Sequence, residues 1–231
     1  MKRALPLLFA HLSLTIAISA EPVVDKSFFN GTSLGGWKST DIKYWSVKDG
    51  AIVGHAEEKV PHNVFIWGPS IVRDFHLSVE VKMTPDNRNA GIQFRSKVHG
   101  ETEALGYQAD IGKGVWGRLY HESGRGKLDW RDRGEAAVKP GEWNKVEILA
   151  VGDRIWTSIN GKIAVSIREP AGEREGKIAF QVHSGLPFTI HYRNPVLTHD
   201  PPVTLAGLDE KALDAELLVI ESPEKKEAAQ R

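Results

Sequence analysis

Planar, hydrogen-bonding side chains recur with the spacing of β-strands between Asn89 and Tyr120. Three short runs in this stretch alternate apolar and polar residues, as a strand does when one face lies in a core and the other in water. The side chains expected to face outward are Gln93, Arg95, Gln108, Asp110, Arg118 and Tyr120. Amide, guanidinium, carboxylate and phenol groups of this kind hold sugars or carboxylates. We predict that these strands form a polar binding face; the alternative is an ordinary solvated sheet face.

A further strand-like run, 176–183, places Gln181 and His183 on its polar side. A single histidine is more often structural than catalytic, but the company of Arg95, Asp110 and Tyr120 would make His183 a candidate if their strands are neighbours. Glu80, His183 and Asp110 together offer nitrogen and oxygen ligands for a divalent metal. Their spacing does not require a metal, so the metal remains an open alternative.

Two familiar active-site patterns do not fit this sequence. Gly112, Gly114 and Gly117 match the Gly-x-Gly-x-x-Gly pattern, but a strand-like run follows them where a dinucleotide site needs a helix. A retaining glycosidase needs two carboxylates about 5–5.5 Å apart. Asp110 is the only outward-facing acid on its strand, so a simple glucanase of the jelly-roll type is not supported.

Short strands separated by turn residues predict an all-β fold. The clearest strand covers 75–83, where every second residue is apolar. The strongest hairpin joins 155–159 to 162–167 through Asn160 and Gly161, a pair that favours the positive φ angles of a type I′ turn. No convincing helical period occurs before residue 200, so we expect an antiparallel sandwich or barrel.

The two ends of the chain differ from this central region. Residues 1–20 combine Lys2 and Arg3 with an apolar run and small residues, which predicts a secretory signal peptide. The alternative, a transmembrane anchor, is disfavoured because the run is short and contains Pro6. The tail, 201–231, is expected to form a short helix followed by disorder, outside the domain; docking on a partner is the alternative.

Composition narrows the compartment and the partners. The 231 residues contain no cysteine, so disulfides and thiolate chemistry are excluded and an exported protein of a bacterial envelope is favoured. The 30 Lys and Arg residues balance 30 Asp and Glu residues, which gives no general attraction to nucleic acid or to anionic membranes. We therefore expect a carbohydrate or glycoside partner, no nucleic acid, no integral membrane association, and a periplasmic or extracellular location.

Seven runs in a fixed order resemble the 3-keto-disaccharide hydrolase family. They are 89–96, 106–111, 116–120, 139–144, 160–161, 176–183 and 192–197. The resemblance covers roughly 24–198, within a predicted domain of 24–200. It implies a concanavalin A-like jelly-roll β-sandwich, of the lectin and glucanase type, in an exported protein that acts on glycans.

The resemblance also implies a reaction. A ketone at C3 of a glycosyl unit acidifies the hydrogen on C2, so a base can remove it, the C1 substituent can leave, and water can then add. As a hypothesis, Asp110 is the base, Arg95 and His183 stabilise the enolate, and Tyr120 assists the leaving group. Sugar hydroxyls would be positioned by Gln108, Gln181, Glu80 and Arg193, with Trp116 stacking on a ring. The alternative for Trp116 is a plug against the core, and a divalent metal could replace Arg95.

One departure from the family limits this inference. Many members carry Glu-x-Gln where this chain has Gln108 and Asp110, so the carboxylate is displaced by two residues on the same strand face. Two alternatives to an enzyme therefore remain: a non-catalytic carbohydrate-binding module on the same face, and an envelope scaffold that uses its charged tail to bind a partner.

Overall fold

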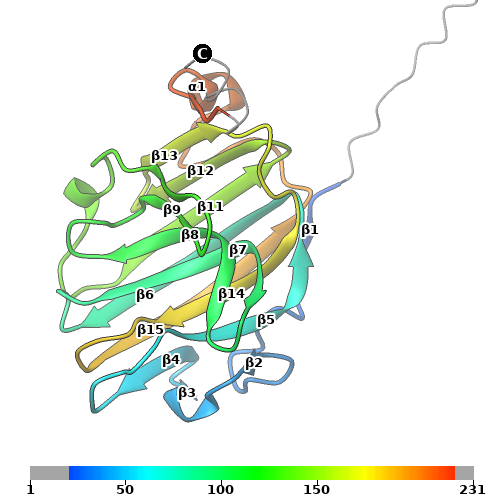
Figure 1. Ribbon diagram of the computed structural model, residues 1–231. Helices are drawn as coiled ribbons and strands as arrows, with labels where there is room; N and C mark the ends of the chain where they lie inside the picture. The colour runs from blue at the N-terminus through cyan, green and yellow to red at the C-terminus, as the bar shows by residue number, and fades with distance from the viewer. Residues whose placement is uncertain (1–20, 222–231) are drawn as a thin grey trace, which may run out of the picture.

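The computed structural model describes residues 21–221. The predicted signal peptide and the last part of the predicted tail lie outside this range. Within it, two sheets pack face to face as a sandwich, one with nine strands and one with seven (Figure 1). Apart from the parallel pairing of the two-residue strand β16 (Leu218–Val219) with β13 (Lys162–Arg168), the neighbouring strands run antiparallel. The predicted all-β jelly-roll sandwich is confirmed.

Each of the two sheets has its own strand order. The nine-stranded sheet runs β16 (Leu218–Val219), β13 (Lys162–Arg168), β12 (Arg154–Ile159), β11 (Asn144–Val151), β6 (Phe75–Thr84), β15 (Phe188–His199), β4 (Ala51–Ala56) and β3 (Trp45–Lys48), with β1 (Val23–Val24) paired to β15. The seven-stranded sheet runs β10 (Gly126–Asp129), β9 (Leu119–Glu122), β8 (Glu103–Gly112), β7 (Asn89–His99), β14 (Gly176–Val182), β5 (Val64–Val72) and β2 (Lys38–Ser39). The helical segments are η1 (Ile42–Tyr44), η2 (Glu135–Ala137) and α1 (Glu210–Asp214).

The alternation seen in the sequence buries one face of each sheet. In β6, Leu77, Val79 and Val81 belong to the single large core cluster between the sheets. An aromatic pair ties the two layers together, because Phe180 and Tyr192 stack with ring centroids 4.1 Å apart. Burying these apolar side chains provides the main driving force for the sandwich.

The predicted hairpin at Asn160 and Gly161 is confirmed. Both residues have positive φ angles, 49° and 82°, and β12 and β13 pair on either side of them. Glycine adopts this conformation without steric cost and asparagine tolerates it, which explains why this dipeptide marks the turn.

The hairpin between β7 and β8 bends out of its sheet. A register shift between Phe94 and Lys97 starts the bend. Beyond it, Ala104 packs with Phe65 and Trp67 on the outer face of β5. Figure 1 shows this green hairpin turning down in front of the seven-stranded sheet. The hairpin thus forms a wall over part of that face.

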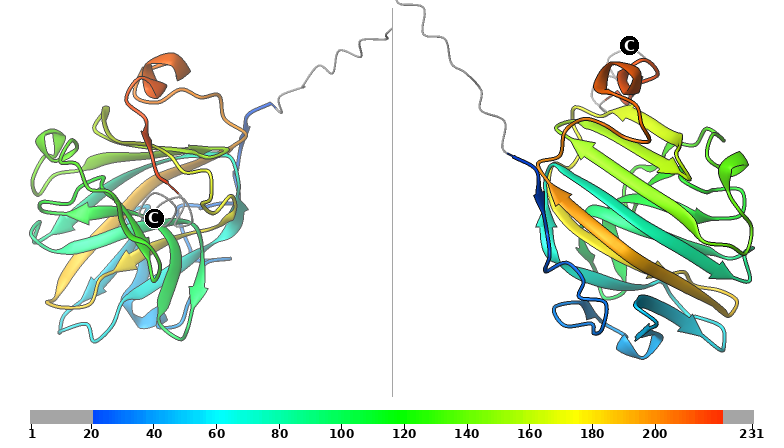
Figure 2. Two further views of the ribbon diagram at one scale, coloured as in Figure 1. Left: turned by 45° about the horizontal axis from the view of Figure 1, so that its top comes forward. Right: turned by 180° about the vertical axis from the view of Figure 1, so that it is seen from behind.

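The C-terminal segment, expected to lie outside the domain, is packed against it up to residue 221. Leu205 and Leu213 cover Trp156 on the outer side of the nine-stranded sheet. The Trp156 indole Nε1 donates a hydrogen bond to the Leu213 carbonyl at 3.1 Å. Figure 2 shows the short helix α1, as expected, at this end of the sandwich. The outward-facing Trp156 creates an apolar patch that needs cover, and this accounts for the difference.

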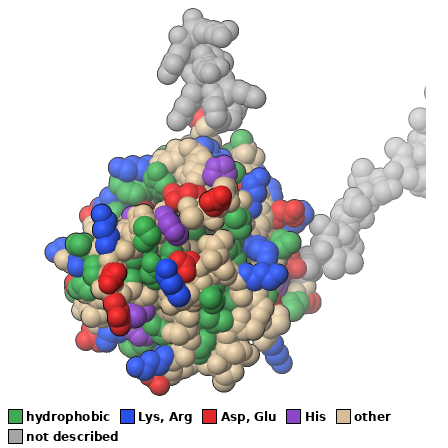
Figure 3. Space-filling view, turned by 60° about the horizontal axis from the view of Figure 1, so that its bottom comes forward, with side chains coloured by type: hydrophobic (Ala, Val, Ile, Leu, Met, Phe, Trp, Pro, Cys, Tyr) green, Lys and Arg blue, Asp and Glu red, His purple; other side chains and the backbone are tan. Residues whose placement is uncertain are grey.

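Charge is spread over the surface. Figure 3 shows acidic and basic side chains interspersed on one face of the molecule, in keeping with the balanced composition. Within the described range, no helix has both the length and the hydropathy needed to cross a bilayer.

Candidate active site

The outer face of the seven-stranded sheet collects four polar side chains, which we call the polar floor. Its members are Gln93 on β7, Gln108 and Asp110 on β8, and Gln181 on β14. Their sequence neighbours, such as Ala109 and Phe180, point into the core, so strand alternation turns the floor outward. Gln93 pairs with Gln108 in register, which pairs in turn with Tyr120 on β9. The structure therefore brings Asp110, Gln108, Gln181 and Tyr120 to one face.

A directional chain of hydrogen bonds ends at Asp110. The Gln93 Nε2 donates to Gln108 Oε1 at 2.8 Å, and Gln108 Nε2 donates to Asp110 Oδ1 at 2.7 Å. The Ser96 Oγ lies 2.9 Å from Gln93 Oε1 and completes the chain. Each bond fixes the orientation of the next amide, so the carboxylate is held in one position.

Burial makes the Asp110 carboxyl a weaker acid than an exposed one. The residue is 5% exposed. Burial raises the pKa of Asp110 to about 7; the nearby charge of Glu122 adds to this rise, while the hydrogen bond from Gln108 and the charge of Arg118 oppose it. A carboxylate that titrates near neutral pH suits a general base, because it is both available and basic enough to accept a proton.

Gly91 makes room for this arrangement. It pairs with Asp110 in register, and a Cβ atom at this position would lie 2.4 Å from Gln108 Cδ. Any side chain there would displace Gln108 from its bond to Asp110. A glycine in the middle of β7 is therefore explained by the close approach of a neighbouring side chain.

Gln181 is a buried amide without hydrogen-bond partners among the described residues. It is fully buried, and neither Nε2 nor Oε1 has a hydrogen-bond partner among the described residues. Leaving a buried polar group unpaired costs about 1–3 kcal/mol. Its register places Gln181 beside Gly91, in one line with Asp110. The unpaired amide makes Gln181 a candidate for binding a group on this face.

Aromatic and charged side chains border the floor on the β9 side. The Trp130 ring contacts Tyr120 edge-on, with 6.0 Å between centroids, and the Arg118 guanidinium lies 5.5 Å from its centroid. Glu122 follows Tyr120 by two residues on the same face, and burial together with the charge of Glu103 raises its pKa. Glu122 is not among the residues predicted from the sequence, although its spacing of two from Tyr120 places both on one strand face.

The opposite border is formed by β5 and the bent hairpin. Phe65 and Trp67 are almost fully buried beneath it, and Asn63 Nδ2 donates a hydrogen bond to Glu103 at 3.2 Å. A cavity of about 510 Å³ opens beside the hairpin tip, between His62 and residues 100–102. The floor thus lies between an aromatic rim on the β9 side and the bent hairpin on the β5 side.

Arg95 does not face Asp110, contrary to expectation. It has a φ of 46° at the register shift of β7, which turns its side chain away from the polar floor. The buried guanidinium donates to the carbonyls of Arg73 at 2.8 Å and Gly152 at 2.9 Å, and contacts Asp74 at 3.2 Å. Arg95 therefore ties turns together, and the proposed role in stabilising an enolate is wrong.

Glu80 and Arg193 lie on the other side of the molecule. Both face outward from the nine-stranded sheet, where Arg193 Nε donates to Glu80 Oε2 at 3.0 Å. They cannot reach a sugar bound at Asp110. The metal set of Glu80, His183 and Asp110 is therefore wrong as well, and no group of three or more potential ligands clusters anywhere in residues 21–221.

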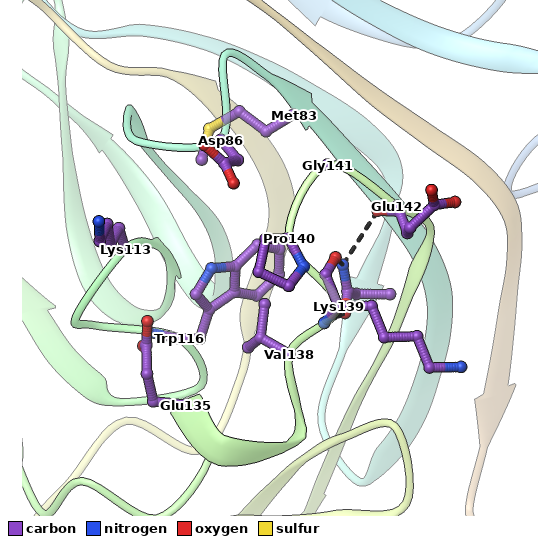
Figure 4. A pocket seen from close by; sticks show the side chains of 11 residues that line it. Met83, Asp86, Lys113, Trp116, Glu135, Val138, Lys139, Pro140, Gly141 and Glu142 are labelled. Atoms are coloured by element: carbon purple, nitrogen blue, oxygen red, sulfur yellow. Dashed lines mark hydrogen bonds between the residues drawn. The ribbon is translucent and has the colours of Figure 1, made fainter.

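Two further predicted site residues, His183 and Trp116, differ in where they lie. His183 follows β14 next to the floor, and its Nδ1 lies 2.7 Å from the Ser184 carbonyl. Trp116 instead joins the core cluster at 4% exposure. Figure 4 shows its indole at the back of a cavity of about 190 Å³, beside Val138 and Pro140. Trp116 is a core plug at the end of the sandwich rather than a platform on the polar floor.

Comparison with known proteins agrees with this architecture. Residues 25–198 match the family described as the 3-keto-alpha-glucoside-1,2-lyase-like domain. No curated protein matches the chain. A Parabacteroides distasonis protein provisionally assigned as a glycosyl hydrolase superposes with a TM-score of 0.56 at 21% identity, covering 75% of this chain and 92% of that one. The β-glucanase of Bacillus licheniformis superposes with a TM-score of 0.51 at 13% identity, covering 79% and 99%. At these identities the superpositions show the fold alone.

Proposed function

The chain belongs to the family of 3-keto-alpha-glucoside-1,2-lyase-like domains, which is carbohydrate-active, and we propose that it cleaves 3-keto-glycosides on the polar floor. The observation that carries the proposal is Asp110. It is a buried carboxylate whose pKa is raised to about 7, held at the end of a fixed chain of amides. This is the property that the first step of the reaction requires of its base.

The proposed reaction begins with proton transfer from C2 of the sugar to Asp110. The C2–H electrons form a double bond to C3, and the ketone oxygen becomes an enolate oxygen. Return of these electrons re-forms the C3 ketone, creates a double bond between C1 and C2, and expels the C1 substituent. Water then adds its oxygen to C1 and a proton to C2, which completes hydrolysis.

Other groups on the same face are assigned by position. Gln181 offers an unpaired amide in line with Asp110, and Arg118 offers a cation whose charge already acts on Asp110. Both would hold the enolate oxygen, a role in which preorganised donors act most strongly. His183 extends this row. Tyr120 and Glu122 would supply the proton to the leaving oxygen, and the raised pKa of Glu122 favours its protonated form.

The test is a time course of the purified protein with a 3-keto-glucoside in D₂O, with and without EDTA. We expect release of the C1 substituent and deuterium at C2 of the product. A free 3-keto-sugar would indicate hydrolysis, whereas an accumulating product with a C1–C2 double bond would indicate a lyase. Loss of activity with EDTA would add a metal to the site. Release without deuterium at C2 would contradict proton abstraction.

A non-catalytic carbohydrate-binding module is the second candidate. It is favoured by the three neutral amides of the floor, Gln93, Gln108 and Gln181, and by the displacement of the family's carboxylate. Saturable binding of a glycoside with no turnover in the same assay would support this function and remove the catalytic one.

Export is proposed on the sequence of residues 1–20. N-terminal sequencing of the protein from a periplasmic or culture fraction should begin at residue 20 or 21. Recovery of the intact N-terminus would contradict cleavage.

A further inference from the structure

A further cavity opens on the outer face of the nine-stranded sheet, on the opposite side of the sandwich from the polar floor. Its volume is about 250 Å³. The side chains that line it include Lys48, Asp49, Lys82, Trp143, His191 and Arg193. The charged and titratable side chains of the lining are therefore three cations, one histidine and one acid.

Arg193 is held rigidly at the edge of this cavity. Its Nε and Nη2 donate to Glu80 at 3.0 and 3.2 Å, and Asn194 Nδ2 donates to the same carboxylate at 2.7 Å. The guanidinium carbon lies 3.8 Å from the ring centroid of Trp143. These contacts fix the guanidinium plane, and the Glu80 pair leaves Nη1 available for a further acceptor.

The other cations are not committed to internal partners. In the part of the chain that the structure describes, neither Lys48 nor Lys82 forms an ion pair, whereas Lys145 on the same face lies 2.8 Å from Glu147. The buried Nδ1 of His191 also lacks a hydrogen-bond partner among these residues. The cavity therefore combines two lysines that have no ion-pair partner among the described residues with the ring of His191.

We propose that this cavity binds an oxyanion, a carboxylate or sulfate, with Lys48, Lys82 and Arg193 as its cationic ligands. Arg193 supplies a directed donor from a fixed plane, and the two lysines supply mobile point charges. The oxyanion can be carried on an acidic sugar or be a free inorganic ion. Since the cavity lies on the face opposite the polar floor, binding there is independent of the proposed function.

His191 makes this binding depend on pH. Burial lowers the pKa of His191, and the charges of Lys82 and Lys48 lower it further, while a hydrogen bond to the Lys82 backbone and the charge of Asp49 oppose them. A bound oxyanion cancels part of the lysine effect and favours the protonated ring. The affinity should therefore increase as the pH falls below the ordinary pKa of histidine, because the ring then adds a positive charge. This charge matters because Glu80 already neutralises part of the charge of Arg193.

The experiment follows the Trp143 indole and His191 ring resonances of the full chain by NMR during three titrations. The ligands are sodium sulfate, methyl glucuronide and neutral methyl glucoside. We expect saturable shifts with sulfate and glucuronide, none with glucoside, and tighter binding at about pH 5.5 than at about pH 7.5. Tighter binding of glucuronide than of sulfate would assign the site to an acidic sugar; the reverse would assign it to an inorganic ion.

Matched variants decide the outcome. Lys82→Gln should weaken binding about tenfold, because it removes one charge that contacts the ligand. Lys145→Gln, already paired with Glu147, should leave the affinity unchanged. Unchanged affinity in Lys82→Gln, equal shifts with glucoside, or no saturation would overturn the proposal. Asp110→Asn should retain oxyanion binding and Lys82→Gln should retain turnover, so failures of the two proposed sites are distinguishable.

Discussion

The two outer faces of this sandwich each carry a carboxylate in the middle of a sheet, with opposite consequences. Asp110 is 5% exposed and accepts a hydrogen bond from a neutral amide, and its pKa is raised to about 7. Glu80 accepts hydrogen bonds from Arg193 and Asn194, which lower its pKa. The hydrogen-bond partner and the burial of a carboxylate, rather than its residue type, therefore decide whether it can serve as a base near neutral pH.

The largest expected difference between the two faces is in turnover. Asp110→Asn removes the proton acceptor while keeping its size and its contact with Gln108. We expect the rate of 3-keto-glucoside cleavage to fall by about 10²–10⁴-fold, the usual contribution of a general base. Glu80→Gln is the matched change on the other face and should leave the rate unchanged. Equal rates for wild type and Asp110→Asn would remove Asp110 from the mechanism.

Arg95 tests the assignment of a structural role close to the proposed catalytic face. Arg95→Met leaves the carbonyls of Arg73 and Gly152 without their buried donor, so we expect a loss of about 3–5 kcal/mol in the free energy of unfolding. Urea denaturation measures this change. Arg73→Met, which removes an exposed pair with Glu175, serves as the control and should cost far less. A stable Arg95→Met protein with no turnover would return Arg95 to the active site.

The raised pKa of Asp110 predicts a dependence of stability on pH. The folded protein holds this proton up to about pH 7, whereas the unfolded chain releases it near 3.8. The stabilisation is therefore complete below pH 3.8 and is lost as the pH rises through 7. At about 1.36 kcal/mol per pKa unit, the difference corresponds to about 4 kcal/mol. Asp110→Asn should abolish this part of the pH dependence, as measured by unfolding between about pH 5 and pH 8.

Replacing Gln181 with an apolar residue should increase stability and decrease turnover. Gln181→Leu removes two buried polar atoms that lack partners, so the free energy of unfolding should increase by about 1–3 kcal/mol. Turnover should decrease, because the amide no longer reaches the substrate. Gln93→Leu is the informative control, since both polar atoms of the Gln93 amide form hydrogen bonds and their loss should destabilise the protein. A Gln181→Leu variant that is both less stable and fully active would contradict this assignment.

The sequence was sufficient for the strands and for part of the site. Alternation placed Gln108, Asp110 and Gln181 outward, and the Asn160 turn was identified from its dipeptide alone. Arg95 was misplaced because alternation assumes a regular strand, and the shift in β7 that turns its side chain is set by pairing with β8. Glu80 faces outward as predicted, but on the other sheet, because strand order depends on long-range contacts that no local pattern records.

Replacing Glu80 should give the smallest change in stability, and its pH dependence tests the contrast between the two carboxylates directly. Its side chain is 33% exposed, so its pair with Arg193 is partly screened by solvent, and Glu80→Gln should cost about 0.2–1 kcal/mol. Because the folded pKa is lowered, this stabilisation is present above the unfolded value and is lost as the pH falls through the folded one. Unfolding curves of wild type and Glu80→Gln should therefore separate at neutral pH and converge in acid, opposite in direction to the Asp110 effect. If the two carboxylates instead showed the same direction, the difference between an ion-paired acid and one bonded to a neutral amide would not support the proposed assignment of the catalytic face.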